Sequence, residues 1–300
     1  MKIDVRSLDL NLLKALDALL DERSVTRAAK RLALTQPAMS GMLNRLRDCF
    51  DDPLFIRSQR GIVPTLRALE LAVPVKNILA EVRELLQTRL FDPATAEMTL
   101  NIAATDYALR AVIVPFMAAI RQQAPGIRVA VLPVNNEQLN LQFERGSIDI
   151  ALITPETTPP DLHAKPLYEE KYVCLMRREH PLAQHGALTM DAFCSQDHAL
   201  VSYHGGSFHG VTDEALMKIG RVRRVTLSVC SFLVLPEILR VSDLISVVPQ
   251  RLALNIQELV ILPPPLEIQG FIKNVVWHER THRDPGHQWL RSLLFSTATV

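Results

Sequence analysis

The sequence has no long apolar segment and few cysteines. No apolar run reaches the roughly 18–20 residues that a helix needs to span a bilayer, and no membrane contact is expected. The first six residues lack the apolar stretch and cleavage site of a signal peptide. The four cysteines lie far apart and form no CxxC pair, which argues against a disulfide framework and a zinc site. We therefore expect a cytoplasmic protein without a bound metal.

The short motifs of the common enzyme classes are also absent. The sequence contains no GxSxG, no GxGxxG after a predicted strand, no Walker loop and no HExxH. Its nine histidines do not complete a set of metal ligands. We therefore expect a protein that is not an enzyme, has no catalytic residues and needs no cofactor.

The charges of the chain are unevenly distributed. A length of 300 residues suits two or three domains, and 48% hydrophobic residues are enough for sizeable cores. Residues 23–67 hold nine Lys or Arg and three Asp or Glu, a local net charge of +6. Residues 98–300 hold 18 basic and 19 acidic residues, a net charge of −1. This division indicates a small module that binds a polyanion, joined to a larger domain of another kind.

Three short helices and a hairpin are predicted at the N-terminus. Residues 9–21 carry leucines at helical spacing. Ser24 can cap a second helix, and Thr35 can cap a third with Pro37 in its first turn, where a missing N–H costs little. Residues 51–65 carry turn signals around a short apolar run, which predicts a two-stranded wing.

The third predicted helix has an apolar side and a polar side. Its apolar side should pack on the first two helices, and consists of Met39, Leu43, Leu46 and Phe50. Its polar stripe consists of Gln36, Ser40, Asn44 and Arg47. Amides can bond adenine in pairs, and arginine suits guanine or phosphate, so this stripe suits the reading of DNA. Gly41 costs about 1 kcal/mol relative to alanine in an exposed helix, which is consistent with a close approach to DNA.

A long fourth helix is predicted over residues 66–90. Apolar residues recur there in steps of three and four, which is typical of a seam that pairs with a second helix; they are Ala68, Leu71, Val75, Ile78, Val82 and Leu85. Pro74 should kink the helix, and Phe91-Asp92-Pro93 should end it at a hinge. The alternative is a single helix packed on its own domain.

From about residue 98, predicted strands alternate with predicted helices. This pattern indicates an α/β architecture with mainly parallel sheets, arranged in two lobes. The predicted strands are 98–105, 128–134, 147–153, 171–177, 199–203, 223–229, 244–248 and 271–277. The predicted helices are 106–123, 137–145, 210–219, 231–242 and 287–298.

The N-terminal motifs resemble those of the LysR-type transcriptional regulators. The matching segments are Asp9-Leu10-Asn11-Leu12-Leu13, Ser24-Val25-Thr26-Arg27-Ala28-Ala29, Leu34-Thr35-Gln36-Pro37-Ala38-Met39-Ser40, Leu43-Asn44-Arg45-Leu46-Arg47, and Asp52-Pro53-Leu54-Phe55-Ile56-Arg57 with Gly61 and Pro64-Thr65. The resemblance implies a winged helix-turn-helix, a dimerising linker helix and a two-lobed effector domain like a periplasmic binding protein. It also implies three partners, namely a double-stranded DNA operator, a small-molecule effector and further copies of the chain, usually in a tetramer built from dimers.

This resemblance places the predicted domains and DNA contacts. We predict a winged helix-turn-helix at 1–65, a linker helix at 66–90 and an effector domain at 98–300. The resemblance implies that Gln36, Pro37 and Ser40 meet DNA, with Arg57 doing so from the wing. The full predicted set is Ser24, Thr26, Thr35, Gln36, Pro37, Ser40, Asn44, Arg45, Arg47 and Arg57. Gly41 stands where the family often has arginine, so one expected contact is missing.

Later segments resemble the branch of that family that senses aromatic acids and flavonoids. They include Tyr172-Val173-Cys174, Gly206-Ser207-Phe208-His209-Gly210 and Ser242-Asp243-Leu244-Ile245. We predict that an organic acid or aromatic compound binds between the lobes, where loops leave the carboxyl ends of strands and helix N-termini offer N–H groups. The predicted ligand-binding residues are Thr105, Asp106, Asn135, Ser202, Phe208, His209 and Phe232.

Two other interpretations of the C-terminal part stay open at this point. It could be a protein-interaction module that binds no ligand, or it could retain an enzymatic activity. A ligand-induced change in thermal stability favours a sensor over an interaction module. Turnover of a candidate effector favours an enzyme.

Overall fold

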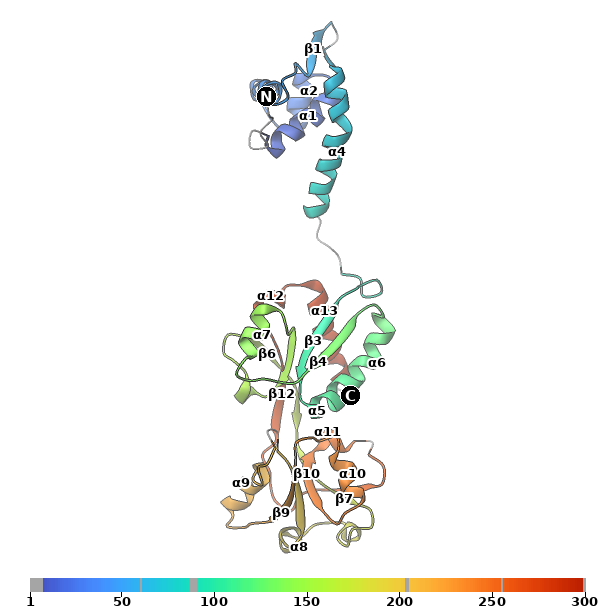
Figure 1. The fold of residues 1–300 in the computed structure, drawn as a ribbon, viewed down its shortest axis with the longest axis vertical. Coiled ribbons are helices and arrows are strands. Elements are labelled where there is room, and N and C mark those ends of the chain that lie inside the picture. Colours follow the sequence, from blue (N-terminus) through green and yellow to red (C-terminus); the bar gives the residue numbers. More distant parts are fainter. Residues whose placement is uncertain (1–7, 60, 87–90, 203–204, 255, 299–300) are drawn as a thin grey trace. The chain divides into compact units, whose positions relative to one another are not determined.

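The computed structural model divides into two units, each with its own core. It describes residues 8–59, 61–86, 91–202, 205–254 and 256–298 (Figure 1). The units are Met1–Arg89 and Leu90–Val300. Residues 1–7 of the predicted first domain and residues 87–90 of the predicted linker helix lie outside the described residues. No described helix combines the length and the apolar character that crossing a bilayer requires.

The N-terminal unit is built from four helices and a hairpin. Asp9, Ser24 and Thr35 cap the first three helices by accepting hydrogen bonds from backbone N–H groups two or three residues inside each helix. The caps predicted at Ser24 and Thr35 are thus confirmed. The elements are α1 (Leu10–Glu22), α2 (Val25–Arg31), α3 (Gln36–Phe50), β1 (Phe55–Ser58), β2 (Gly61–Pro64) and α4 (Leu66–Leu86).

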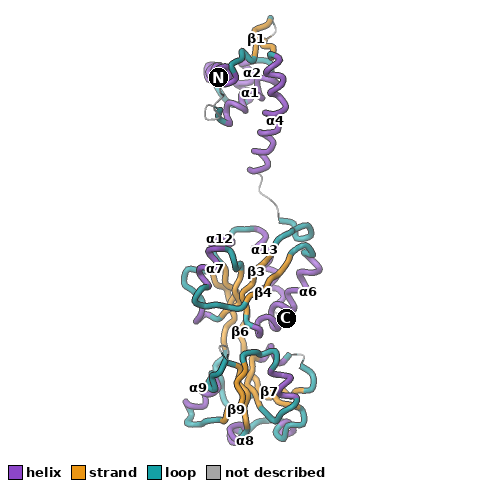
Figure 2. Tube along the Cα trace, viewed as in Figure 1, coloured by secondary structure: helices purple, strands orange, loops and turns teal. Residues whose placement is uncertain are grey.

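The wing is the antiparallel pair β1–β2 (Figure 2), and a glycine fixes it to the helices. Gly61 has a φ of +131°, and a Cβ built there would lie 2.6 Å from the carbonyl oxygen of Arg23. The next residue, Ile62, donates its N–H to that same carbonyl oxygen at 3.1 Å. A side chain at position 61 would therefore push the wing away from the turn between α1 and α2.

Helix α4 is continuous through Pro74 and packs on the core of its own unit. Ala68 and Val75 are buried there, and Leu71 is partly buried against them. This corrects the predicted pairing seam, because three of its six positions contact their own unit. The apolar residues that α4 leaves exposed are Leu66, Leu69, Val73, Ile78, Leu85 and Leu86.

The C-terminal unit consists of two lobes, each built on a five-stranded sheet. The first sheet has the order β4-β3-β5-β12-β6, from β3 (Thr99–Ala104), β4 (Arg128–Leu132), β5 (Ile150–Ile153), β6 (His163–Glu170) and β12 (Phe271–Trp277). The second has the order β11-β7-β10-β8-β9, from β7 (Tyr172–Arg177), β8 (Asp197–Val201), β9 (Arg224–Val229), β10 (Ile245–Pro249) and β11 (Leu259–Leu262).

The sheets are mixed, so the prediction of mainly parallel sheets is wrong. In the first sheet β3 pairs in parallel with β4 and β5, whereas β12 pairs antiparallel with β5 and β6. In the second sheet β8 pairs in parallel with β10 and β9, whereas β7 pairs antiparallel with β10 and β11. Strands β6 and β11 were not predicted. The physical reason is that the chain leaves the first lobe and returns to it, so β6 and β12 run against each other.

Helices cover the sheets of both lobes. The predicted helix 106–123 is present as three consecutive segments, with π geometry in the middle one. The predicted helix 231–242 is shorter and begins only at Leu235. The elements are α5 (Asp106–Ala108), η2 (Leu109–Ile113), α6 (Val114–Gln123), α7 (Leu139–Arg145), η3 (Pro155–Thr157), η4 (Ala183–His185), α8 (Met190–Ser195), α9 (Val211–Lys218), α10 (Leu235–Arg240), α11 (Gln250–Ala253), α12 (Glu279–His282) and α13 (Pro285–Ala298).

Two chain crossings connect the lobes, and they lie in close contact. One runs from β6 through Lys171 into β7, and the other leads through Gly270 into β12 (Figure 1). A Cβ built on Gly270 would lie 2.1 Å from the carbonyl oxygen of Glu170. Only a glycine lets the two crossings approach this closely.

Candidate nucleic-acid interface and ligand cavity

The start of α3 is an exposed part of the predicted DNA-binding face. Gln36 and Pro37 are exposed, and Ser40 one turn later is half-buried. Thr26 is exposed on α2, which packs against α3. No atom lies within 4 Å of a Cβ built on Gly41, so packing inside the unit does not require its small size. The structure therefore leaves a low, polar surface at the beginning of α3.

The arginines of α3 are bonded inside the unit. Arg47 donates from Nε to the carbonyl oxygen of Pro53 at 2.9 Å and from Nη2 to that of Phe55 at 3.3 Å. Its Nη1 donates to Oδ1 of Asn44 at 3.2 Å, so these two residues of the predicted polar stripe contact each other. Nη2 of Arg45 lies 3.0 Å from Oδ2 of Asp9. Arg47 thus ties the wing to α3 rather than standing free.

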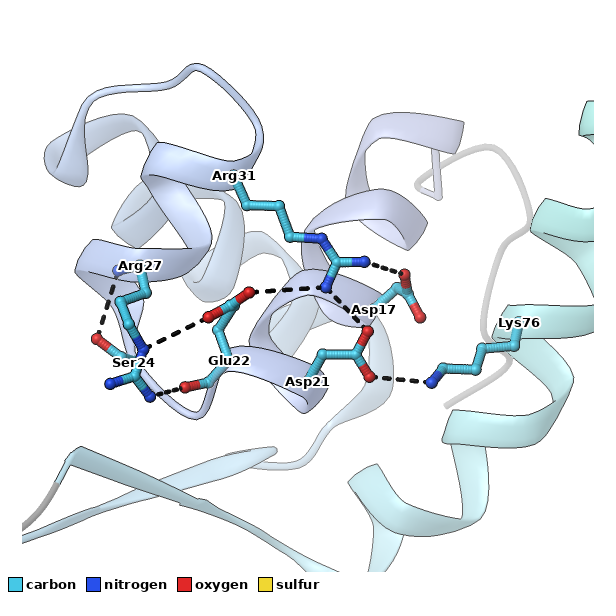
Figure 3. Close-up of polar contacts among 7 residues, drawn as sticks. All are labelled: Asp17, Asp21, Glu22, Ser24, Arg27, Arg31 and Lys76. Atoms are coloured by element: carbon cyan, nitrogen blue, oxygen red, sulfur yellow. Dashed lines mark hydrogen bonds and ion pairs between the residues drawn. The ribbon is translucent and has the colours of Figure 1, made fainter.

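A network of ion pairs joins α1, α2 and α4 (Figure 3). Asp21 of α1 accepts from Nη1 of Arg31 at 2.8 Å and from Nζ of Lys76 at 2.9 Å. The hydrogen bond from Arg31 is the largest cause that lowers the pKa of Asp21 below its ordinary value. Arg27 pairs with Glu22 at 3.4 Å. These pairs link α2 to α1 and join α1 to α4, while the side chain of Arg27 stays 66% exposed.

Arg57 differs from these paired arginines. It is exposed on β1, and in the described part of the chain no carboxylate oxygen lies within ion-pair distance of it. By contrast, Arg27, Arg31, Arg45 and Arg67 each have a carboxylate partner. Arg57 is therefore a wing cation that needs no rearrangement before it meets a phosphate.

Two adjoining cavities lie at the ends of strands of the first lobe. One of about 180 Å³ lies in the first lobe, and one of about 240 Å³ lies between the lobes. Thr105, Thr154 and Lys273 line both. The walls of the larger cavity are mostly aromatic and come from both lobes; they are Tyr107, Tyr172, Phe232, Pro249 and Phe271.

The aromatic walls are held by contacts among the rings. The ring centroid of Tyr107 lies 6.0 Å from that of Phe232 and 5.9 Å from that of Phe271. The hydroxyl of Tyr107 donates to the carboxylate of Glu170 and lies 3.1 Å from the hydroxyl of Tyr168. Burial is the largest cause that raises the pKa of Tyr107, so this phenol stays neutral. Tyr107 is thus fixed in orientation at the edge of the cavity.

Lys273 is the charged group of the cavity. It is only 4% exposed, and it lies on β12 beside a shift in register against β6. Its Nζ lies 5.7 Å from the ring centroid of Tyr107 and 5.4 Å from that of Phe271. Burial lowers the pKa of Lys273 to about 8, although Glu170 and Glu156 oppose this shift. The cavity therefore combines aromatic walls with one buried cation.

Two of the predicted ligand residues line the larger cavity, and a third joins the lobes. Thr105 caps α5 by accepting from the N–H of Ala108 at 3.3 Å, which leaves its O–H free to donate. Phe232 contributes its ring from the second lobe. Asp106 accepts from the N–H of Phe232 at 2.7 Å and therefore links the first lobe to the second.

The other predicted ligand residues line neither cavity. Asn135 accepts from the N–H of Gln138 in an exposed turn. Phe208 is 55% exposed, and His209 is exposed in the same loop. Ser202 accepts from the N–H of Ser207 at the start of that loop. The structure does not bring these four residues together with Thr105, and their ligand roles stay predictions.

Sequence reasoning missed the residues Tyr107, Thr154, Tyr172 and Lys273 of the cavity. Lys273 had a usable signal, because it is a charged residue inside the otherwise apolar predicted strand 271–277. The aromatic and threonine positions gave none, because such residues are common in buried strands and at helix starts.

A histidine cluster was also not predicted. Ligand atoms of His163, Glu279 and His282 all lie within 4.8 Å of one another. The two imidazole rings are stacked, with centroids 4.1 Å apart and planes 13° apart. Imidazole lone pairs lie in the ring plane, so stacked rings direct them along parallel lines rather than toward one ion. Nε2 of His163 instead bonds Glu279 at 2.5 Å.

Comparisons with known proteins cover almost the whole chain. Residues 10–69 match the bacterial regulatory helix-turn-helix protein of the lysR family, and residues 94–298 match the LysR substrate binding domain. The transcriptional activator NagR of a Ralstonia species is 38% identical over 99% of this chain and 100% of its own length. The activator NahR of Pseudomonas putida is 35% identical over the same shares.

Solved structures show the same arrangement of elements. A structure described as a probable transcriptional regulator of Pseudomonas aeruginosa is 32% identical, covers 97% of each chain and has a TM-score of 0.60. Full-length CbnR in complex with its target DNA covers 97% of this chain and 100% of its own, with a TM-score of 0.59. At 15% identity the likeness to CbnR concerns the fold alone.

Proposed function

Because this chain belongs to the LysR family of bacterial transcription regulators, we propose which of its faces reads DNA and which cavity holds its effector. The chain is a DNA-binding transcription regulator whose activity a small molecule modulates. In our proposal the start of α3 enters the major groove, where Gln36 and Ser40 meet base edges. Arg57 contacts the DNA backbone from the wing, and Arg47 acts by holding that wing in place.

Replacing Arg57 with alanine should weaken DNA binding about equally for all sequences. The loss of one phosphate contact should lower the slope of log affinity against log salt by about 1. The measurement is a titration of the full chain with a genomic fragment recovered by footprinting, repeated over a range of salt concentrations. Arg178→Ala removes an exposed arginine of the second lobe and serves as the control. An unchanged slope for Arg57→Ala would remove Arg57 from the interface.

We propose that the effector is an organic acid or aromatic compound bound in the cavity between the lobes. The observation that carries this proposal is the cavity of about 240 Å³ with aromatic walls from both lobes. A ligand that touches both lobes stabilises one angle between them, and so favours one arrangement of the DNA-binding units. The hydrogen bond from Phe232 to Asp106 already joins the two sides of this cavity.

Replacing Thr105 with valine should weaken effector binding about tenfold, because the free O–H is lost as a hydrogen-bond donor. Calorimetry with a panel of aromatic and aliphatic carboxylates measures the change. The matched control is Thr189→Val, because Thr189 caps α8 in the same way, at 3.2 Å from the N–H of Ala192, and lines neither cavity. An effector that bound Thr105→Val as tightly as the parent would show that the ligand lies elsewhere.

The remaining parts of the proposal concern assembly and place. We propose domains at 1–65, 66–90 and 98–300, self-association through the exposed apolar residues of α4, and a tetramer built from dimers. We also propose that the protein acts in the cytoplasm, because it acts on DNA. We also propose that the C-terminal unit binds its effector without chemical change. Recovery of a chemically altered effector after incubation with the full chain would contradict that last statement.

A further inference from the structure

We propose that the ammonium group of Lys273 receives the carboxylate of the effector, so that Lys273 makes the cavity select an anion. This inference rests on the proposed binding of the effector between the lobes. It adds a residue that the sequence analysis did not place in the site, and it assigns a charge to the ligand.

The first argument is that Lys273 is buried without a partner. Buried ammonium groups in proteins are almost always paired, because an isolated charge is costly to remove from water. Within the described ranges no carboxylate oxygen lies within 4.0 Å of Nζ of Lys273, and no hydrogen bond from it is formed. Nζ of Lys273 is not among the fully buried polar atoms and lines both cavities, so an oxygen from outside the chain can reach it and pair with it.

The nearby acidic groups do not fill this role. Glu170 is buried, but one of its oxygens accepts from the hydroxyl of Tyr107 and the other from the N–H of Lys171 at 3.0 Å. Glu156 is exposed on η3 and lies beyond ion-pair distance. Both carboxylates favour the charged form of Lys273 from a distance without occupying its donors.

The second argument is the position of Lys273 in the cavity. Lys273, Thr105 and Thr154 line both adjoining cavities, so they form the region where these meet. The register between β12 and β6 shifts between Lys273 and Asn274, where β6 carries the extra residue Leu167. The free O–H of Thr105 can donate to the same carboxylate.

The third argument is that the polar and the aromatic side chains lie in different parts of the cavity. The polar region around Lys273 lies against the rings of Tyr107 and Phe271, and the larger cavity continues to Tyr172 and Phe232 in the second lobe. A flat ring with one carboxylate matches this division, with its charge at Lys273 and its ring among the aromatic side chains. A neutral molecule of the same shape would leave the positive charge of the ammonium group without a compensating negative charge, so the cavity should bind it more weakly.

Benzoate and its neutral amide, benzamide, provide the probes for a calorimetric test with the full chain. The parent should bind benzoate more tightly than benzamide. Lys273→Met should lower the affinity for benzoate by at least about thirtyfold, because one partner of a buried charge pair is removed. Its affinity for benzamide should change by less than about threefold, since methionine keeps the length and apolar contacts of the lysine.

Two further variants separate charge from structure. Lys165→Met removes a lysine that is exposed on the neighbouring strand β6, and its affinities should equal those of the parent. Lys273→Arg keeps the positive charge and should keep the preference for benzoate. Equal losses of benzoate and benzamide in Lys273→Met, or no loss of either, would overturn the role of Lys273. If neither probe bound the parent, the proposed effector cavity itself would be overturned.

Discussion

Replacing Leu69 and Val73 with glutamate should produce monomers whose affinity for DNA is lower by about a hundredfold or more. These residues lie on α4 and are 48% and 67% exposed, and Leu66 beside them is 81% exposed. They follow one another in steps of three and four and therefore share one face of the helix. Ala68 and Val75, which pack on the unit's own core, lie on a different face.

The large effect follows from pairing two recognition helices. A dimer holds a second α3 near the second half-site, so its binding gains from a high effective concentration. A monomer must bind each half-site independently. Glutamates in the apolar face would be buried without partners in the dimer, which disfavours association.

Sedimentation velocity and DNA titration measure the two consequences together. The control is Val241→Glu, because Val241 is 86% exposed in the second lobe and the change adds the same charge to an apolar position. Retention of the parental oligomer by Leu69→Glu/Val73→Glu would contradict pairing through this face. A monomer that bound DNA like the parent would contradict the link between pairing and affinity.

Lys273→Met should stabilise the ligand-free protein by about 1–3 kcal/mol at neutral pH. Burial lowers the pKa of Lys273 to about 8 from an ordinary value of 10.5, so the folded state carries a charge it holds less favourably than the unfolded chain does. Methionine fills a similar volume and carries no charge. The residue that we propose for effector binding is therefore one that costs stability when the cavity is empty.

This stabilisation should depend on pH in one direction. Below pH 8 both states of the parent hold the proton, and the full penalty is present. Between about pH 8 and 10.5 the unfolded state holds more protons at Lys273 than the folded state, so the parent gains stability as the pH rises. The advantage of Lys273→Met should therefore shrink over this window.

Urea unfolding of the parent and the variant at several pH values tests this expectation. The difference between the two proteins is the quantity to follow, because the buried phenols of Tyr168 and Tyr172, with pKa values raised to about 12, titrate in both. An advantage that stayed constant between pH 7 and 10 would mean that Lys273 is not the cause. A variant less stable than the parent at pH 7 would mean that its charge is compensated inside the protein.

The N-terminal fold could be predicted because its signals are local. Ser24 and Thr35 cap helices through N–H groups only three residues away, and these positions can be read directly from the sequence. The wing follows from a short apolar run between turn residues. What the sequence did not reveal is that Arg47 bonds the wing rather than pointing outward, because that depends on where Pro53 and Phe55 place their carbonyl oxygens.

The seam on α4 shows where helical periodicity becomes ambiguous. Steps of three and four place residues on one face, but they do not say whether a partner or the same unit covers that face. Val75 fits a seam by spacing, yet it is buried in its own unit. The exposed face with Leu69 and Val73 could be recognised only after the packing of α1 against α4 was known.

The mixed sheets and the cavity could not be predicted from local sequence patterns, for a similar reason. Strand β6 carries polar side chains and a proline, so its periodicity is weak, and it forms because β12 returns beside it. Lys273 and Thr105 are far apart in the sequence. They line the same cavity because β12, which carries Lys273, and β3, which Thr105 follows, lie in one sheet with only β5 between them. Thr105 and Phe232 could be placed at the cavity from their positions at the ends of predicted strands, and the single lysine in an apolar strand was a further usable signal.

A footprint of the full chain on its own operator, with and without saturating benzoate and with benzamide as the neutral control, tests whether the cavity controls DNA binding. We predict that benzoate changes the protected region or shifts the protein concentration needed for protection by more than about threefold, as expected for a ligand with different affinities for two states. Benzamide should leave the footprint as it is. Calorimetry would first show that benzoate fills the cavity. An unchanged footprint under those conditions would contradict the claim that this cavity controls DNA binding.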